Sequence, residues 1–295
     1  MRVLGLDVGN SKIKLCYLES DGVLDEESVR WRSVLLPLGT GGRYDFEVGV
    51  PREVRLSGKL FGFDPDALNA VVCCSSHAYS YPLLHESVSN LGSILTHTFG
   101  AIPSYMVAVD GTLTPARKIQ GLDPEALSAH VLTNYYGSAL LGSRIVDKGI
   151  GIDIGTTSTD VIPIVEGRVD PVGLAKPSEY LRFRYQHNRL GWYGVTWTPL
   201  TMIASEVMTP HGTYQVVARD HRSDIIFALD DKMNLELLHQ HAYYQPPDRQ
   251  RALSDLCALV GLDRRLLKEP EILAVREFLF ERLVDKVAGL VLAVT

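Results

Sequence analysis

The first third of the chain alternates hydrophobic and polar residues in short runs, and such runs predict β-strands. Strands are expected at residues 2–8, 12–18 and 29–36, and again at 69–74 and 104–109. The run Val71-Val72-Cys73-Cys74 is apolar throughout, which is typical of a strand covered on both faces. Helices should fill the gaps between these strands, so the pattern predicts an α/β fold.

Helix signals are clear at three places. Asp64-Pro65 and Asp123-Pro124 each combine an N-cap Asp with Pro at the first helical position, and the second helix is expected to run to about residue 142. Beyond about residue 222 the pattern turns helical, and Glu271 to Leu292 carries an apolar stripe at Ile272, Val275, Phe278, Leu279, Leu283 and Val287. The segment 176–200 is rich in Arg, Tyr and Trp without a clean period, so it is interpreted as a functional loop or a sheet edge.

One pattern occurs twice. Gly5-Leu6-Asp7-Val8-Gly9-Asn10-Ser11-Lys12 returns about 146 residues later as Gly151-Ile152-Asp153-Ile154-Gly155-Thr156-Thr157-Ser158. In each copy a strand ends at Asp, small residues turn the chain, and a second apolar strand returns and closes at a turn signal, Asp21-Gly22 or Glu166-Gly167. A repeat at this spacing predicts two related halves, residues 1–145 and 146–295.

The repeated residues suit a phosphate group. Glycine lets backbone N–H groups approach an anion, and the side chains beside it add donors, so the expected phosphate-binding residues are Gly9, Asn10, Ser11, Gly155, Thr156, Thr157 and Ser158. Asp7 and Asp153 are placed to hold a hydrated Mg²⁺, unless they only cap their turns, and Asp160 is either a further metal residue or structural. Lys12 either neutralises phosphate as a point charge or points outward. Both hairpins are expected to close on one phosphorus group.

Composition and charge exclude several classes of protein. The 295 residues are 46% hydrophobic and 22% charged, as in globular two-domain proteins. A net charge of −6 and the absence of a Lys/Arg run argue against a protein that binds nucleic acid. No apolar run is long enough to span a membrane, and no signal peptide is visible. The four cysteines show no C-x-x-C spacing, and Cys73 and Cys74, at the end of an expected buried strand, are predicted to be core thiols. A reduced, cytoplasmic setting is therefore expected.

The second copy also carries a family resemblance. Asp153 to Ile164 resembles hydantoinase/oxoprolinase-like proteins linked to tetrahydromethanopterin C1 transfer, which include the methanofuran-pathway synthase. Their pattern is roughly Asp-φ-Gly-Ser-Thr-Thr-Thr-Asp-Ile-Ile-Pro-Ile. Residues 134–142 and Gly194-Val195-Thr196-Trp197-Thr198-Pro199 resemble two further family segments, the second being Gly-Val-x-Arg-Thr-Pro. Together with the paired hairpins, the resemblance implies the two-domain actin, sugar kinase and Hsp70 type of fold, which is ribonuclease H-like.

What the resemblance implies is a transferase. The family synthase joins a furan-methanamine diphosphate to the phenol oxygen of a glutamyl-tyramine and releases pyrophosphate. The N–H groups of the hairpins and Mg²⁺ would neutralise the charge of this pyrophosphate. His77, beside the 69–74 strand, is the candidate base for the phenol. The candidate substrate-binding residues are Arg189, Trp192, Tyr193 and Trp197. A wall of Arg and aromatic residues is also expected, and it would suit a glutamyl substrate or equally a subunit interface in a homodimer or hetero-oligomer; its members are Arg182, Arg184, Arg189, Tyr180, Tyr185, Trp192 and Tyr193.

Departures from the family pattern leave alternatives open. Ser75-Ser76-His77 stands where the family has Thr-Gly-Glu, Arg189 stands at a Glu position and Trp197 at an Arg position. The alternatives are an ATP-dependent small-molecule kinase or hydantoinase-like hydrolase, and a catalytically silent ligand-binding or partner subunit. Proteins of this fold usually continue with a Gly-rich segment that holds adenosine. The given sequence ends at Thr295 without this adenosine segment, which is either truncated or lost in the lineage. The sequence therefore predicts phosphate binding more directly than ATP binding.

Overall fold

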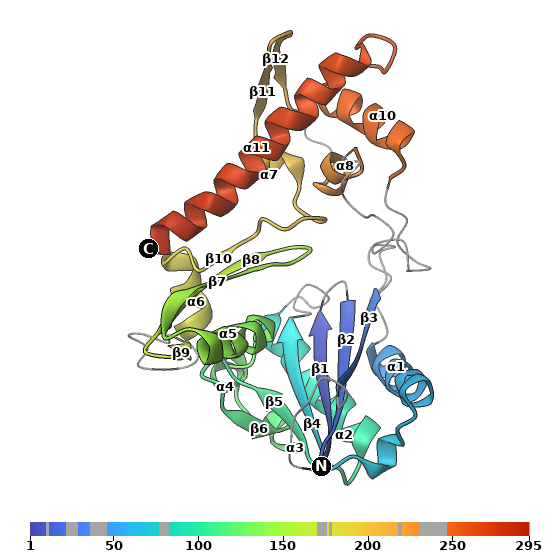
Figure 1. The fold of residues 1–295 in the computed structure, drawn as a ribbon, viewed down its shortest axis with the longest axis vertical. Coiled ribbons are helices and arrows are strands. Elements are labelled where there is room, and N and C mark those ends of the chain that lie inside the picture. Colours follow the sequence, from blue (N-terminus) through green and yellow to red (C-terminus); the bar gives the residue numbers. More distant parts are fainter. Residues whose placement is uncertain are drawn as a thin grey trace. The chain divides into compact units, whose positions relative to one another are not determined.

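The computed structural model describes residues 1–9, 12–21, 29–35, 46–76, 83–169, 176, 179–217, 220–229 and 247–294. The chain forms two compact units, each of which contains one Asp-x-Gly hairpin (Figure 1). Unit 1 comprises Met1–Lys148 and Ile164–Phe183, and unit 2 comprises Gly149–Pro163 and Arg184–Thr295.

Unit 1 is built on a six-stranded sheet with the order β3-β2-β1-β4-β5-β6 (Figure 1). Its strands are β1 (Arg2–Gly9), β2 (Lys12–Glu19), β3 (Val29–Leu35), β4 (Ala70–Ser76), β5 (Ser104–Val107) and β6 (Leu113–Pro115). β2 is antiparallel to β1 and β3, whereas β1, β4 and β5 are parallel. This is the ribonuclease H-like order, so the expected fold class is confirmed. The five strands predicted from the sequence are also confirmed.

The alternation in β1 and β2 gives the sheet two unlike faces. One face is buried and apolar, with Leu4, Leu6, Val8, Ile13, Leu15 and Tyr17. Helix α1 (Phe46–Phe61) packs against β2, and α2 (Leu84–Phe99) packs against α1 and β5. Asp7 and Lys14 lie on the other face of the same two strands. The strand β1, whose other face is buried in the core, therefore carries the Asp7 carboxylate on this second face.

The two predicted N-caps are present. The Asp64 carboxylate accepts the N–H of Asp66 at 3.0 Å before the 3-10 helix η2 (Pro65–Ala67). The Asp123 carboxylate accepts the N–H of Ala126 at 2.8 Å before α4 (Pro124–Ser128). Both helices are short, as is α3 (Ala116–Ile119).

The prediction of one continuous helix to residue 142 is wrong. The chain breaks after α4 and starts again as α5 (Asn134–Ile145). Leu132 has a φ of 52°, in the left-handed region, which ends a right-handed helix. The Thr133 N–H donates to the Ser75 carbonyl at the end of β4, 2.7 Å away. A hydrogen bond to the sheet thus replaces a helical one.

The second hairpin brings β7 (Lys148–Ile154) beside β8 (Thr159–Val165), and β8 also pairs with β10 (Leu190–Gly191). In unit 1 the end of β8 pairs with β9 (Arg168–Val169) through the predicted turn, where Glu166 and Gly167 have φ of 51° and 65°. The loop interpretation of 176–200 is wrong for residues 180–186, which form α6 (Tyr180–Gln186), whereas β10 is a sheet edge as expected.

Unit 2 has an apolar core of its own. It is built from α7 (Leu200–Ile203), β11 (Glu206–Thr209), β12 (Gly212–Gln215), α8 (Asp224–Phe227), α10 (Arg249–Leu259) and α11 (Glu269–Val294). The predicted stripe of α11 is confirmed, because Ile272, Val275, Leu279 and Leu283 are buried. His211 lies in the turn between β11 and β12, also as expected. Among the described residues, no helix is both long and apolar enough to cross a membrane.

Candidate functional site

The first hairpin places a carboxylate with one unused oxygen at the centre of the unit 1 sheet. Asp7 on β1 is paired with Lys14 on β2 and with Cys74 on β4. The Lys14 ammonium lies 2.8 Å from Asp7 Oδ2. Asp7 Oδ1 is buried and has no hydrogen-bond partner among the described residues. A buried carboxylate oxygen without a donor is costly, so this atom is suited to a bound cation or to a water that the cation holds.

The same edge of the sheet also presents a helix N-terminus. β1 and β4 are parallel and end side by side, with Gly9 opposite Ser76. The Ser75 N–H donates to Thr133 Oγ1 at 3.1 Å, next to the Thr133 N–H bond to Ser75 described above. These two bonds fix the start of α5 at the carboxyl ends of parallel strands, where α/β sheets place their ligands. The positive end of the helix dipole favours an anion there.

The two cysteines of β4 do not contribute a nucleophile. Burial, with a smaller effect of the nearby Asp7 charge, raises the pKa of the Cys74 thiol to about 12. Burial also raises the pKa of Cys73 well above its usual value. A raised pKa keeps both thiols protonated at neutral pH, and the thiolate is the nucleophilic form. The prediction of core thiols is confirmed for Cys73, which is fully buried, while Cys74 is partly buried.

Several predicted residues of this region are not described. Asn10, Ser11 and His77 lie outside the described residues, and Lys12 starts β2 with a side chain outside them. Lys14 was missed by the sequence argument, although a signal existed. In a tight hairpin with Val8 opposite Ile13, the residue opposite Asp7 must be Lys14, which points to the same face.

A separate segment of unit 2 holds the tip of the second hairpin. Within the tip, the Gly155 N–H donates to the Ser158 carbonyl at 2.8 Å. The Val195 N–H donates to the Gly155 carbonyl at 3.0 Å, and the Trp197 N–H donates to the Thr156 carbonyl at 2.8 Å. Occupied carbonyl groups present less negative potential to an anion at the tip. We call residues 194–198 the clasp.

The clasp explains why its first residue is glycine. A Cβ on Gly194 would lie 2.4 Å from Thr156 C and Thr157 N. Thr198 Oγ1 accepts the Gly194 N–H at 2.6 Å and donates to the Gly194 carbonyl at 2.8 Å, which folds the clasp back on itself. The Gly and Thr of the Gly-Val-x-Arg-Thr-Pro pattern therefore hold the predicted phosphate-binding residues Thr156 and Thr157 in place.

The second hairpin differs from the first at the residue opposite its Asp. The hydrogen bond between Gly155 and Ser158 sets a register that puts Asp153 opposite Asp160, where the first hairpin has Lys14. Asp160 is buried and forms an ion pair with the buried Arg184. This pairing favours the structural alternative for Asp160. It also removes Arg184 from the exposed wall that the sequence suggested.

The predicted substrate-binding residues of unit 2 follow one another along the clasp and β10. The Arg189 carbonyl accepts the Val161 N–H at 3.0 Å, which continues the pairing of β10 with β8. The ring centres of Trp192 and Tyr185 are 6.1 Å apart. The Lys286 ammonium lies 6.0 Å from the centre of the Tyr193 ring.

Trp197 takes the place of the family Arg, but a guanidinium is still present. The Arg222 guanidinium lies 4.3 Å from the centre of the Trp197 ring, a cation–π contact. Arg222 also forms an ion pair with Asp220. A cavity of about 260 Å³ adjoins the pair, lined among others by His221 and Arg251. Arg222 was missed because it is 25 residues away in the sequence and meets Trp197 only through the fold.

Fold and site together define an α/β protein with two Asp-x-Gly hairpins, one in each unit. Residues 72–190 match the family model described as hydantoinase/oxoprolinase. No curated protein matches this chain. Among the described residues, no group of three His, Cys, Asp or Glu side chains is arranged to hold a metal ion. A hydrated Mg²⁺ requires only one or two carboxylates, and Asp7 fits that requirement.

Solved structures show similarity at low identity. Acetone carboxylase in its nucleotide-free structure is 12% identical, over 98% of this chain and 61% of the other, with a TM-score of 0.40. The Ppx/GppA family member of Aquifex aeolicus is 13% identical, over 99% and 90%, with a TM-score of 0.37. The ethanolamine utilization protein EutJ of Carboxydothermus hydrogenoformans is 15% identical, over 58% and 50%, with a TM-score of 0.34. This chain thus spans about half to three fifths of the EutJ and acetone carboxylase chains. Such TM-scores carry no information on ligand or reaction.

Proposed function

We propose that this protein is an enzyme that acts on a phosphate or diphosphate ester with the help of Mg²⁺. The observation that carries the proposal is the state of Asp7. One oxygen is held by Lys14, and the other is buried without a partner among the described residues. A core strand that ends in such a carboxylate, beside a glycine and a helix N-terminus, has the groups that a hydrated cation and a phosphate require.

Each residue of the first hairpin then has a defined task. Asp7 Oδ1 holds the cation or one of its waters. Lys14 holds Asp7 in orientation and adds positive charge toward the phosphate oxygens. The N–H groups at the end of β1 and the start of α5 donate hydrogen bonds to the phosphate oxygens. When bound, Mg²⁺ neutralises the charge that develops on a departing phosphate.

The second hairpin, in unit 2, is assigned donors for phosphate oxygens and no cation site of its own. Gly155 and Thr156 are held by the clasp, and the charge of Asp160 is balanced by Arg184. Asp153 is assigned to orient a phosphate-bound water. Trp192, Tyr193 and Trp197 supply aromatic surface near this hairpin and are assigned to the organic part of the substrate.

For the reaction itself, the family resemblance favours the condensation of a furan-methanamine diphosphate with a phenol. The phenol oxygen forms a bond to the CH₂ carbon, the carbon–oxygen bond to the diphosphate breaks, and the phenol proton passes to a base. The furan ring stabilises positive character on the CH₂ as the pyrophosphate leaves. The match of residues 72–190 to the hydantoinase/oxoprolinase model agrees with this resemblance and equally with the hydantoinase-like hydrolase alternative.

The test is pyrophosphate release from furfuryl diphosphate with tyramine as the phenol, in the presence of Mg²⁺. Asp7→Asn should reduce turnover about a hundredfold or more, because a preorganised charge at the reacting group is lost. Asp66→Asn, an exposed acid of η2, is the matched control and should retain full activity. Full activity of Asp7→Asn refutes the proposal. Phosphate release from ATP instead identifies the kinase or hydrolase alternative.

A further inference from the structure

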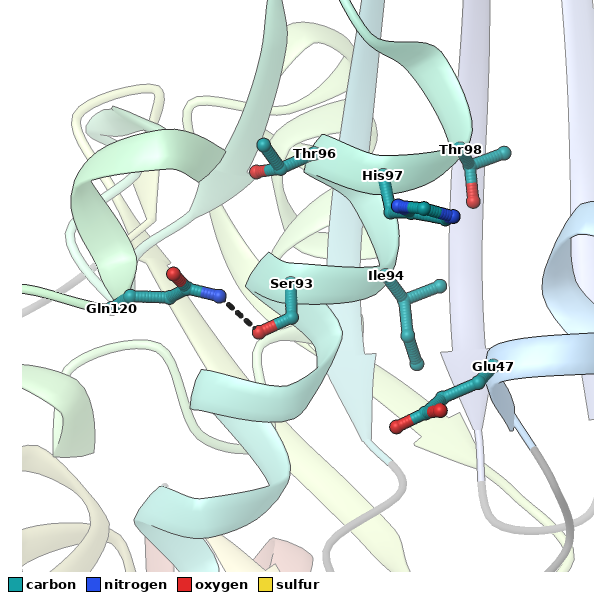
Figure 2. A pocket seen from close by; sticks show the side chains of 7 residues that line it. All are labelled: Glu47, Ser93, Ile94, Thr96, His97, Thr98 and Gln120. Carbon is teal, nitrogen blue, oxygen red and sulfur yellow. Dashed lines mark hydrogen bonds between the residues drawn. The ribbon is translucent and has the colours of Figure 1, made fainter.

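A second hollow of unit 1 lies away from the Asp7 edge. It has a volume of about 520 Å³ and is lined by Glu47, Ser93, Ile94, Thr96, His97, Thr98 and Gln120 (Figure 2). The lining comes from the first turn of α1, the last two turns of α2 and the residue that ends α3. Because α2 connects the carboxyl end of β4 to the amino end of β5, its last turns lie at the opposite sheet edge from Gly9. This pocket is therefore separate from the proposed phosphate site.

The hydroxyl groups of Ser93 and Thr96 have already used their hydrogens. Thr96 Oγ1 donates to the Gly92 carbonyl at 2.8 Å, and Ser93 Oγ donates to the Ser89 carbonyl at 3.2 Å. Ser93 Oγ also accepts from the Gln120 amide, and Figure 2 shows this bond at one side of α2. Since the Gln120 NH₂ group is engaged in this way, its carbonyl oxygen is the group left to meet a ligand. The pocket therefore offers mainly acceptors.

The charges of the pocket point the same way. Glu47 brings a carboxylate, and the described lining contains neither Lys nor Arg. Among the described residues, Glu47 Oε1 accepts one long bond of 3.4 Å, from the Asn90 amide. Thr96, His97 and Thr98 lie in the last turn of α2, whose carbonyl groups form the negative end of the helix dipole. A carboxylate and a helix C-terminus both favour a cation and disfavour a phosphate.

One further atom lacks a partner. Thr98 Oγ1 is buried without a hydrogen-bond partner among the described residues. Its hydroxyl can accept from a ligand amine or donate to a ligand hydroxyl. The volume of this pocket is within the range of small-molecule sites, roughly 300–1,000 Å³.

We propose that this pocket binds a small organic cation, a compound with one or two ammonium groups. Glu47 pairs with the ammonium, and the oxygens of Gln120, Ser93 and Thr96 accept its hydrogens. Ile94 gives the carbon chain of the ligand an apolar contact. This inference does not depend on the reaction of the phosphate site.

The probes are putrescine and ethanolamine, with 1,4-butanediol and inorganic phosphate as the neutral and anionic comparisons. Binding is followed by titration calorimetry on the full chain. Putrescine should bind more tightly than butanediol, and phosphate should leave the pocket empty. Glu47→Gln should weaken putrescine by about tenfold or more, because a charged hydrogen bond becomes a neutral one. Glu86→Gln, on the first turn of α2 and outside this pocket, should change nothing.

A second variant removes only the unpartnered hydroxyl. Thr98→Val keeps the shape of the side chain and should weaken putrescine severalfold while leaving the melting temperature unchanged or raised. Equal putrescine affinity in the wild type and in Glu47→Gln overturns the proposal. So does preferential binding of butanediol, phosphate binding that Glu47→Gln alters, or the absence of amine binding at millimolar concentration.

Discussion

Asp7 and Lys14 lie opposite each other on β1 and β2, with 2.8 Å between Oδ2 and Nζ, and the pair leaves the second carboxylate oxygen of Asp7 without a partner among the described residues. The Lys14 side chain is 58% exposed and that of Asp7 23% exposed. Ion pairs this exposed contribute little stability, about 0–1 kcal/mol. The pair is therefore better explained by ligand binding than by folding.

Replacing Lys14 should separate its contribution to ligand binding from its contribution to folding stability. Lys14→Met is expected to weaken the binding of Mg²⁺ pyrophosphate by roughly fivefold, as one charge near a phosphate in wet surroundings contributes about 1 kcal/mol. The free energy of unfolding should change by less than about 1 kcal/mol. Calorimetric titration and urea unfolding measure the two quantities. Lys59→Met, in the exposed last turn of α1, is the control, and an equal loss of affinity there would contradict the assignment.

The clasp predicts an unusual response to adding a methyl group. Gly194→Ala would place Cβ 2.4 Å from backbone atoms of the hairpin tip, so it should destabilise unit 2 by about 2–3 kcal/mol or displace the tip. Gly137→Ala, on the exposed face of α5 with nothing within 4 Å, should instead stabilise by about 0.5–1 kcal/mol. Thermal unfolding of both variants measures the contrast. A harmless Gly194→Ala would show that the clasp does not hold the tip.

The buried pair of Asp160 and Arg184 predicts a loss of stability. Asp160→Asn leaves the buried Arg184 guanidinium without its counter-charge, which should cost roughly 3–5 kcal/mol. Asp160→Asn combined with Arg184→Met should recover part of that loss, which a double-mutant cycle on unfolding free energies measures. Mg²⁺ affinity should stay the same in every variant that folds. A folded Asp160→Asn with wild-type stability and lost Mg²⁺ affinity would assign Asp160 to the metal after all.

His130 predicts a pH-dependent stability. Burial lowers the pKa of its imidazole, and a bond to the Val107 carbonyl offsets this in part. The folded protein therefore takes up the proton at lower pH than the unfolded chain, whose His pKa is about 6.5. The contribution of neutral His130 is complete above that pH and is lost as the pH falls through it. His130→Gln should flatten the decline in unfolding free energy between about pH 7 and 5, whereas His211→Gln, exposed in a turn, should not. Parallel curves for wild type and His130→Gln would refute the account.

Features that depend on neighbouring residues were predictable from the sequence. The strands β1 and β2, the N-caps Asp64 and Asp123 and the stripe of α11 all follow from local pattern. The split between α4 and α5 does not, because the bond from Thr133 to Ser75 joins residues 58 apart. Residues 123–142 carry a helical pattern, and only the position of β4 shows where it must stop.

The same distinction applies to the candidate site. The Asp-x-Gly pattern predicted where each carboxylate lies on its strand, and hairpin register would have added Lys14. The burial of Arg184 against Asp160 and the contact of Arg222 with Trp197 require tertiary structure, since exposed and buried Arg look alike in sequence. The functional roles of all the predicted site residues, including Asp7, Asp153, His77 and Trp197, stay predictions.

The central claim is that Asp7 holds a magnesium–phosphate group through its unpartnered oxygen. Calorimetric titration of the wild type and of Asp7→Asn with pyrophosphate, with and without Mg²⁺, tests it directly. The account predicts Mg²⁺-dependent binding to the wild type that Asp7→Asn weakens at least about tenfold, because the carboxylate charge is lost while its shape is kept. Pyrophosphate binding of equal affinity in both proteins, or binding that ignores Mg²⁺, would contradict it.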